Sequence, residues 1–409
     1  MVSPPPRHPG RTRVTAALVI DILLALALLG TVLRGWSSGF FRVLGSLAGL
    51  GLGAVATYLT LPALMSWVPD PSWRVPAAIA ATVVLVAGGA VIGSIIGTLF
   101  RTGARKIKLG LIDRLAGAAA SLAVGALTIL LISSGITALG TPWLTPAVAG
   151  SRIVQTIQGL TPAPLATALS EARDAFIAEA PAWVVDTVDA PALDGVAAPA
   201  VDVSTEGVET ALDSVALISG TAAECGVNMT GSGFVVAPGR IVTNAHVVAG
   251  VDRPVVDLPN ELPSAGRVVY WDAEADLAVI AVESTETSAL PLSATLGVGS
   301  EAVVAGHPLG GPLAVGGASV LAAGPLTLST TGADTVTRDA YTLAASVKKG
   351  NSGGPVLTTD GAVAGVVFGT SRTEGDIAYA VTMAELTPVV AEAPSLVKTV
   401  PSGSCETAG

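Results

Sequence analysis

Lys349-Gly350-Asn351-Ser352-Gly353-Gly354-Pro355 places one hydroxyl within a run of glycines, and an apolar, strand-like segment follows from Val356 to Phe368. Glycines adopt backbone angles that residues with a Cβ resist, so the chain can turn sharply here and present the Ser352 side chain. The same turn can direct the backbone N–H groups of Gly350 and Ser352 toward one point, where a developing oxyanion would lie. Taken alone, the run is also compatible with a plain Gly-Pro turn between two strands.

Two motifs upstream complete a catalytic set. Thr243-Asn244-Ala245-His246 precedes one apolar stretch, and Asp276-Leu277-Ala278-Val279 opens another. A serine hydroxyl is a weak nucleophile, which needs a base within hydrogen-bonding reach and a third group to orient that base. The set predicts a triad with Ser352 as nucleophile and His246 as general base and then general acid. Asp276 would orient the imidazole and stabilise its charged form.

The alternatives for the base and the acid are few. Of the three histidines, His8 lies in a Pro/Arg-rich tail, and His307 precedes a proline, which is typical of an extended or turn residue without chemistry. A histidine after a β-rich run could also simply be buried and satisfied. For the acid, Asp272 and Glu274 are typical of solvated turn residues, whereas Asp276 stands at the edge of an apolar run.

The three motifs together resemble the trypsin-like serine proteases of the HtrA type, over about residues 205–395. The resemblance implies two six-stranded antiparallel β-barrels with the site in the cleft between them. It also implies that Ser346 lies at the base of the pocket for the residue before the cut, and a neutral side chain there argues against a strict Arg or Lys requirement. The residues expected to bind the substrate along the cleft are Val366, Val367, Phe368 and Gly369.

The first third of the chain predicts a membrane domain. Charged residues make up 13% of the chain, well below the usual quarter. Four segments contain Asp21 as their only charge, and each is near or above the roughly 20 residues that cross a bilayer: Val14–Leu33, Val43–Leu61, Val75–Phe100 and Leu115–Leu139. A cleaved signal peptide and fully buried soluble helices are the alternatives, but neither is typical of four such runs in succession.

Within these spans, glycines recur at four-residue spacing, as in Gly45, Gly49 and Gly53, which favours close packing of helix backbones in lipid. Asp21 is costly within a span, so it is either a functional residue or a polar anchor near the interface. The membrane region resembles CvpA (colicin V production) membrane domains through Asp21, Gly30, Arg34-Gly35, Gly39 and the later segment Asp113-Arg114-Leu115-Ala116-Gly117.

Charge predicts the topology. Five cationic residues connect the third and fourth spans and should stay in the cytoplasm: Arg101, Arg105, Lys106, Lys108 and Arg114. Both termini then lie outside, with the second half of the chain extracytoplasmic (periplasmic). The arginines of the N-terminal tail argue the other way, but a short tail can cross despite its charge.

The two cysteines, Cys225 and Cys405, stand near the two ends of the second half. In an oxidising compartment they could pair and join those ends, and two unrelated buried thiols are the alternative. Residues 141–200 are rich in proline and alanine and contain one helical-looking stretch, Leu165–Glu179, so they are typical of a tether. This linker could also be a self-cleavage site.

Residues 1–140 hold 11 basic and 3 acidic side chains, and residues 201–409 hold 8 basic and 22 acidic ones. The acidic second half argues against nucleic acid as a partner. It favours basic protein substrates or an acidic working environment.

The whole arrangement is similar to the MarP-type membrane-anchored serine proteases of mycobacteria and other actinobacteria. We therefore predict an all-α, four-helix transmembrane domain (1–140), a linker (141–200) and an all-β, double-barrel chymotrypsin-like protease domain (201–409). The expected partners are membrane lipid and protein substrates in the periplasm or cell wall, with neither cofactor nor metal. The resemblance implies roles in acid or oxidative stress resistance and in cell-envelope maintenance. The alternative is a CvpA-like membrane scaffold or export factor with an accessory peptide-binding barrel.

Overall fold

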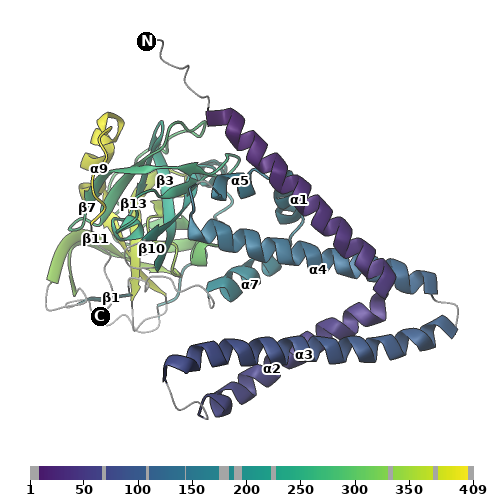
Figure 1. Ribbon diagram of the computed structural model, residues 1–409. Coiled ribbons are helices and arrows are strands. Elements are labelled where there is room, and N and C mark those ends of the chain that lie inside the picture. The colour runs from purple at the N-terminus through teal and green to yellow at the C-terminus, as the bar shows by residue number, and fades with distance from the viewer. Residues whose placement is uncertain are drawn as a thin grey trace. The chain divides into compact units, whose positions relative to one another are not determined.

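The computed structural model describes residues 9–66, 71–106, 110–142, 144–174, 184–187, 196–222, 227–329, 335–371 and 376–403. Residues 18–130 form one compact unit, which is helical. Residues 131–409, with the residues before Leu18, form a second compact unit, which is mainly β-sheet (Figure 1).

Four long helices supply the helical unit: α1 (Pro9–Ser38), α2 (Phe40–Ser66), α3 (Pro71–Lys106) and α4 (Gly110–Leu139). Helices α2 and α3 lie side by side in Figure 1, and their glycines explain why they can do so. A Cβ on Gly45 would overlap the carbonyl oxygen of Gly93, and a Cβ on Gly49 would overlap that of Gly89. The four-residue glycine spacing therefore allows the two backbones to touch, as such spacing does in lipid.

Helix α4 fixes the corner between α1 and α2. Gly39, at φ +78°, separates the two helices in a backbone conformation that favours glycine. The buried carboxylate of Asp113 accepts a hydrogen bond from the backbone N–H of Phe41 (3.2 Å) and so satisfies one of the free donors at the start of α2. A Cβ on Gly117 would lie 2.6 Å from the carbonyl oxygen of Gly35, so α4 also packs closely on the end of α1.

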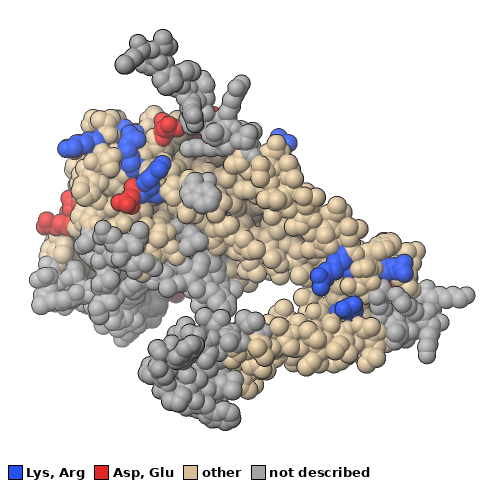
Figure 2. All heavy atoms as spheres, viewed as in Figure 1, with Lys and Arg blue, Asp and Glu red and all other residues tan. Residues whose placement is uncertain are grey.

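Three described helices are long and apolar enough to cross a membrane, at Ala16–Ser38, Phe40–Thr57 and Gly110–Thr137, and Val84–Phe100 is a shorter apolar stretch of α3. The apolar helices were predicted from the sequence, whereas the count of four full spans stays a prediction. On the face shown in Figure 2, the charged side chains that are visible on the helical unit are blue and gather at one end.

Short elements follow α4: α5 (Thr145–Ala149), α6 (Arg152–Gly159), α7 (Ala163–Asp174) and β1 (Val184–Thr187). The predicted helix over 165–179 corresponds to α7 as far as Asp174, and residues 175–183 lie outside the described chain. No pattern in the sequence predicted α5 and α6, because five to eight residues are too few for a helical period to show. Ser151 caps α6 by accepting a hydrogen bond from the backbone N–H of Val154 (3.2 Å).

The first sheet of the β-rich unit has the strand order β6-β5-β2-β3-β4-β8-β7, and all its pairs are antiparallel. Its pairing runs from β6 to β7 without a closing pair among the described strands, so a closed first barrel stays a prediction. The strands are β2 (Val215–Ala222), β3 (Val227–Ala237), β4 (Arg240–Thr243), β5 (Val255–Asp257), β6 (Ser264–Ala265), β7 (Arg267–Asp272) and β8 (Leu277–Ala281).

The second sheet closes on itself, because β9 pairs with both β10 and β12. Between them the order is β10-β11-β14-β13-β12, and the strand β1 adds to β10 and, in parallel, to β13. The strands are β9 (Glu301–Gly306), β10 (Ala314–Ser329), β11 (Thr335–Ala345), β12 (Pro355–Leu357), β13 (Val363–Ser371) and β14 (Ile377–Thr382). Helix α8 (Glu206–Leu212) precedes β2 in the chain, and helix α9 (Met383–Glu392) follows β14.

One core cluster joins the two sheets. It contains Phe234 and Leu277 from the first sheet and Val366 and Phe368 from the second, all essentially inaccessible to solvent. Burying such side chains stabilises the fold by roughly 1.5–3 kcal/mol each. The shared core therefore holds the loops of the two sheets in fixed relative positions.

Strand β5 carries a titratable group, Asp257, whose pKa is raised from 3.8 to about 7 by burial. Between these values the folded chain holds a proton that the unfolded chain has released, so the free energy of unfolding falls as pH rises through this window. The residue is only partly buried, and solvent screening should limit the loss to about 1–2 kcal/mol. The test is denaturation of the full-length chain in detergent at about pH 4 and at about pH 7. Between these two pH values, the free energy of unfolding of the wild type should fall by this amount more than that of Asp257→Asn. An equal pH dependence in both proteins would contradict the assignment.

Candidate active site

The first sheet brings His246 and Asp276 together. His246 begins the 3₁₀ turn η1 (His246–Val248) after β4, and Asp276 immediately precedes β8, which pairs with β4. The imidazole Nδ1 lies 2.8 Å from Asp276 Oδ2 and 3.0 Å from Oδ1, and the backbone N–H of His246 donates to Oδ1 (3.1 Å). Since a carboxylate can only accept, Nδ1 carries the hydrogen, and Nε2 is left to act as a base.

The backbone at Asp276 has a left-handed conformation, with φ +54°, which is uncommon for a residue other than glycine. Its carbonyl oxygen accepts a hydrogen bond from the buried Asn244 side chain (2.8 Å). Asn244 stands two residues before His246, so this bond ties the two turns together. Such backbone strain persists only where surrounding contacts hold it, and it is concentrated at functional sites.

The second sheet presents Ser352 on a glycine turn. Gly350 and Gly353 have φ +93° and +85°. A Cβ on Gly350 would overlap the carbonyl oxygen of His307, and a Cβ on Gly353 would overlap that of Ser232, so both positions require glycine. The Ser352 hydroxyl donates to the carbonyl oxygen of Phe368 on β13 (3.3 Å).

Ser232 on β3 joins this turn to the first sheet. It is fully buried, its backbone N–H donates to Ser352 O (2.7 Å), and its hydroxyl donates to Gly350 O (2.7 Å). The same hydroxyl accepts from the backbone N–H of His307 (2.8 Å). No sequence motif pointed to Ser232, because the partners of its hydroxyl lie 75 residues or more away in the chain.

Leu309 donates its backbone N–H to Lys349 O (2.6 Å), which fixes the plane of the peptide bond that carries the Gly350 N–H. The backbone N–H groups of Gly350 and Ser352 donate to no other described residue. Both donors are therefore available to an added acceptor.

His307 packs with its backbone against Gly350 in the glycine turn, and it is not a described partner of Asp276. Its Nδ1 donates to Gly311 O (2.9 Å), and burial lowers the pKa of its imidazole, so the side chain is neutral near pH 7. That this loop histidine carries no chemistry stays a prediction.

A buried cation also reaches Asp276. Arg338 on β11 is 5% exposed, and its Nη1 lies 3.4 Å from Asp276 Oδ2. Its guanidinium Cζ lies 5.0 Å from the centroid of the Phe368 ring. No sequence motif pointed to Arg338, which stands 62 residues beyond Asp276 on the other sheet.

The residues predicted to bind the substrate lie close to the serine in the fold, with most of their side chains turned away from solvent. Val366, Val367 and Phe368 are buried on β13, and Gly369 pairs with Tyr379 on β14. These residues would therefore contact a substrate through their backbone N–H and C=O groups. Ser346, just after β11, is exposed.

Cys225 and Cys405 lie outside the described residues. The described segments that lead to them converge on the loop after η1. A Cβ on Gly220 would overlap a methyl group of Val251, and Ser402 donates its hydroxyl to Val251 O (3.2 Å) and accepts from Gly250 N (3.2 Å).

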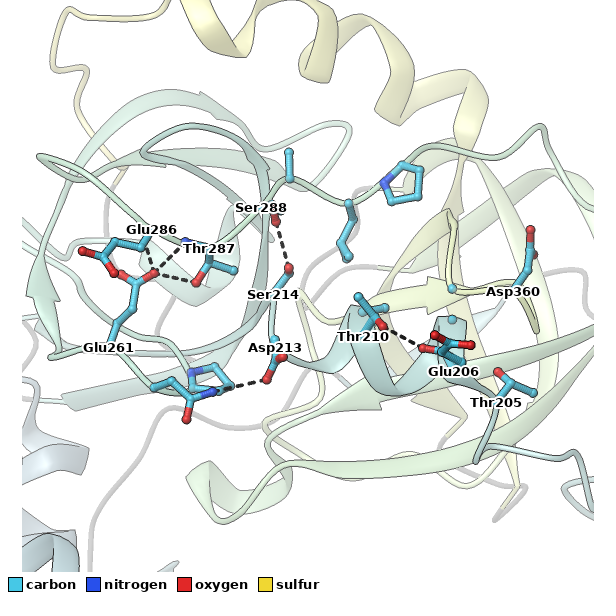
Figure 3. A pocket seen from close by; sticks show the side chains of 18 of the residues that line it. Thr205, Glu206, Thr210, Asp213, Ser214, Glu261, Glu286, Thr287, Ser288 and Asp360 are labelled. Carbon is cyan, nitrogen blue, oxygen red and sulfur yellow. Dashed lines mark hydrogen bonds between the residues drawn. The ribbon is translucent and has the colours of Figure 1, made fainter.

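A separate pocket of about 820 Å³ lies where α8 meets the loops around Pro259, Thr287 and Asp360 (Figure 3). Neither His246, Asp276 nor Ser352 lines it. Among the described residues that line it, none is Lys or Arg and five are acidic: Glu206, Asp213, Glu261, Glu286 and Asp360. Glu261 is occupied by three donors from Glu286 and Thr287, so part of this charge only stabilises the loop.

Two family models match the chain. A trypsin-like peptidase domain matches residues 231–366, which contain His246, Asp276 and Ser352, and the colicin V production protein matches residues 20–162. Serine protease Rv3671c of Mycobacterium tuberculosis (strain ATCC 25618 / H37Rv) is 30% identical over 392 residues, which are 94% of this chain and 98% of the relative.

The chain belongs to the family of trypsin-like serine proteases that includes Rv3671c. A probable periplasmic serine endoprotease DegP-like of Hahella chejuensis is 35% identical over 140 residues, 34% of this chain and 29% of the relative. The crystal structure of the Rv3671c protease in its active form aligns with 54% of this chain and 99% of that chain, at 30% identity and a TM-score of 0.49.

The chain is therefore a serine endopeptidase of the trypsin-like type, and its substrates are proteins. It also carries a CvpA-like domain whose apolar helices indicate association with a membrane. The two family resemblances predicted from the motifs are confirmed.

Proposed function

We propose that this protease is anchored in the plasma membrane by several spans and cleaves extracytoplasmic proteins through a triad of His246, Asp276 and Ser352. The observation that supports it most is the contact between His246 Nδ1 and the Asp276 carboxylate at 2.8 Å. This contact selects the imidazole tautomer in which Nε2 carries no hydrogen and can accept the serine proton.

In this mechanism the Ser352 hydroxyl exchanges its hydrogen bond to Phe368 O for one to His246 Nε2. Ser352 Oγ attacks the scissile carbonyl as Nε2 takes its proton, and the tetrahedral intermediate collapses when His246 gives that proton to the leaving amine. Water then hydrolyses the acyl-enzyme by the same steps. Asp276 stabilises the imidazolium at each stage.

The N–H groups of Gly350 and Ser352 are the proposed oxyanion hole, because neither donates to another described residue. For substrate binding we propose the backbone of Val366, Val367, Phe368 and Gly369 on β13, with Ser346 at the pocket for the residue before the cut. An exposed, uncharged Ser346 would not impose a strict requirement for Arg or Lys.

For the remaining architecture, we propose four spans within 1–140, a linker over 141–200 and the protease domain over 201–409 outside the cytoplasm. The cationic connection between α3 and α4 supports this orientation. Disulfide pairing of Cys225 with Cys405 is supported by the convergence of Gly220 and Ser402 on Val251. Roles in acid or oxidative stress and in envelope maintenance rest on resemblance to the MarP-type proteases alone.

The test compares wild-type full-length chain in detergent with Ser352→Ala on an unfolded, fluorescently labelled protein. Wild type should release labelled peptides, and Ser352→Ala should lower the rate by about 10⁴-fold or more. If both proteins only bind the substrate, the chain is a membrane scaffold with a peptide-binding barrel. If both cleave it equally, Ser352 is not the nucleophile.

A further inference from the structure

Arg338 is a charged side chain in a position that is otherwise apolar. It lies on β11 with 5% of its surface exposed, facing the ring of Phe368, which is 1% exposed. Burying a cation is costly unless the charge is paired. The described ion pair that Arg338 makes is with Asp276, which is also almost fully buried. The Asp276 carboxylate therefore compensates the buried charge of Arg338.

The contact joins the two halves of the site. His246 and Asp276 belong to the first sheet, whereas Ser352, Arg338 and Phe368 belong to the second or to its turns. Arg338 touches Asp276 on one side and the Phe368 ring on the other, and the Phe368 carbonyl receives the Ser352 hydroxyl. A change at Arg338 thus acts on the reacting groups through their neighbours.

Both oxygens of the Asp276 carboxylate contact His246, and one of them also contacts Arg338. Oδ1 accepts from the backbone and Nδ1 of His246, and Oδ2 lies 2.8 Å from Nδ1 and 3.4 Å from Arg338 Nη1. Asn244, the other described partner, holds the Asp276 backbone and carries no charge. The described contacts of the Asp276 carboxylate thus join it to one permanent cation and to one imidazole that becomes a cation during the reaction.

We propose that Arg338 is a positioning residue for the triad. It holds the Asp276 carboxylate turned toward His246 Nδ1, and its positive charge lies beside the carboxylate that orients the imidazole. Without the guanidinium the carboxylate would act on the imidazole uncompensated, and an uncompensated anion favours the charged form of a neighbouring base. The inference rests on the proposed triad and assigns a new role within it.

Another arginine shows what a purely structural role looks like. Arg240 on β4 is partly buried, and its Nε donates to the carbonyl oxygens of Ala393 and Leu396 (3.0 Å each). These bonds hold the end of α9 against the first sheet without touching the triad. Arg240→Met is therefore a matched control for Arg338→Met, since each variant replaces a guanidinium by an uncharged chain of similar length.

The test measures the rate constant for labelling of Ser352 by a fluorophosphonate across pH, on full-length protein in detergent. Each trace is normalised to its own endpoint, so an unfolded fraction does not enter. For Arg338→Met we expect a rate about tenfold lower at neutral pH and an acidic limb displaced to higher pH by about one unit. Arg338→Lys, which keeps the charge, should retain the wild-type position of the limb, and Arg240→Met should retain both the position and the rate.

A double-mutant cycle separates action through Asp276 from general loosening of the fold. In the Asp276→Asn background, Arg338→Met should change the rate by less than about twofold, because the carboxylate through which it acts is gone. A wild-type pH profile in Arg338→Met, or equal effects in both backgrounds, would overturn the proposal. If Arg338→Met does not fold, a displaced limb in Arg338→Lys would overturn it. Absence of labelling in the wild type would instead refute the proposed triad.

Discussion

Asp276→Asn should lower kcat by about 10⁴-fold while leaving the fold intact. The asparagine amide would place an N–H₂ group or a weak neutral acceptor beside His246 Nδ1, where the structure has carboxylate oxygens at 2.8 and 3.0 Å. An amide donor there selects the opposite tautomer, which puts the hydrogen on Nε2 and removes the base. Neither form of the amide stabilises the imidazolium. Steady-state hydrolysis of a peptide substrate by the full-length chain measures the effect.

Asp272→Asn is the matched control. Asp272 lies in the same turn and accepts hydrogen bonds from the backbone N–H groups of Glu274 and Ala275 (2.9 and 3.1 Å), which an asparagine oxygen can also accept. We expect its kcat to stay within about twofold of wild type, since it does not touch the imidazole. A large loss in both variants would mean that the turn matters and the Asp276 carboxylate does not.

Gly350→Ala should lower kcat by about 10²–10³-fold, the usual effect of losing one oxyanion donor. The added Cβ would overlap His307 O and lie 2.8 Å from Leu309 N, while the φ of +93° disfavours any residue with a Cβ. The peptide that carries the Gly350 N–H must therefore move. The loss should fall mainly on kcat and little on KM, because the oxyanion forms only in the transition state.

Gly299→Ala provides the comparison. Gly299 has a similar φ of +85°, but nothing lies within 4 Å of the Cβ that alanine would add. It should show the cost of a left-handed alanine to stability and leave kcat near that of wild type. Equal losses of kcat in the two variants would indicate a global effect of strain, and an unchanged kcat in Gly350→Ala would remove Gly350 from the oxyanion hole.

The sequence was most informative where one local pattern determines geometry. A glycine run indicated a sharp turn, which the structure has at Gly350 and Gly353, and glycines at four-residue spacing favoured close helix packing, which the structure has between α2 and α3. Asp276 was preferred over Asp272 because it opens an apolar run, and the structure places its carboxylate against the His246 imidazole. These features depend on short segments whose residue types leave few conformations.

The remaining features of the site depend on tertiary contacts that no spacing reveals. Ser232 and Arg338 acquire their partners only when two sheets pack on one core, and nothing in a strand sequence marks them beforehand. The seven-strand order of the first sheet and the addition of β1 to β13 likewise follow from pairings distant in sequence. The short helices α5 and α6 lacked a readable period.

The central claim is that Ser352 is a nucleophile activated by His246 and Asp276. Its most direct measurement is the treatment of the full-length chain in detergent with a fluorophosphonate, followed by mass mapping of the modified residue. We predict one modification, on Ser352, which is lost in Ser352→Ala and slowed by about 10⁴-fold in Asp276→Asn. Modification of another residue, or equal labelling of wild type and Ser352→Ala, would contradict the claim.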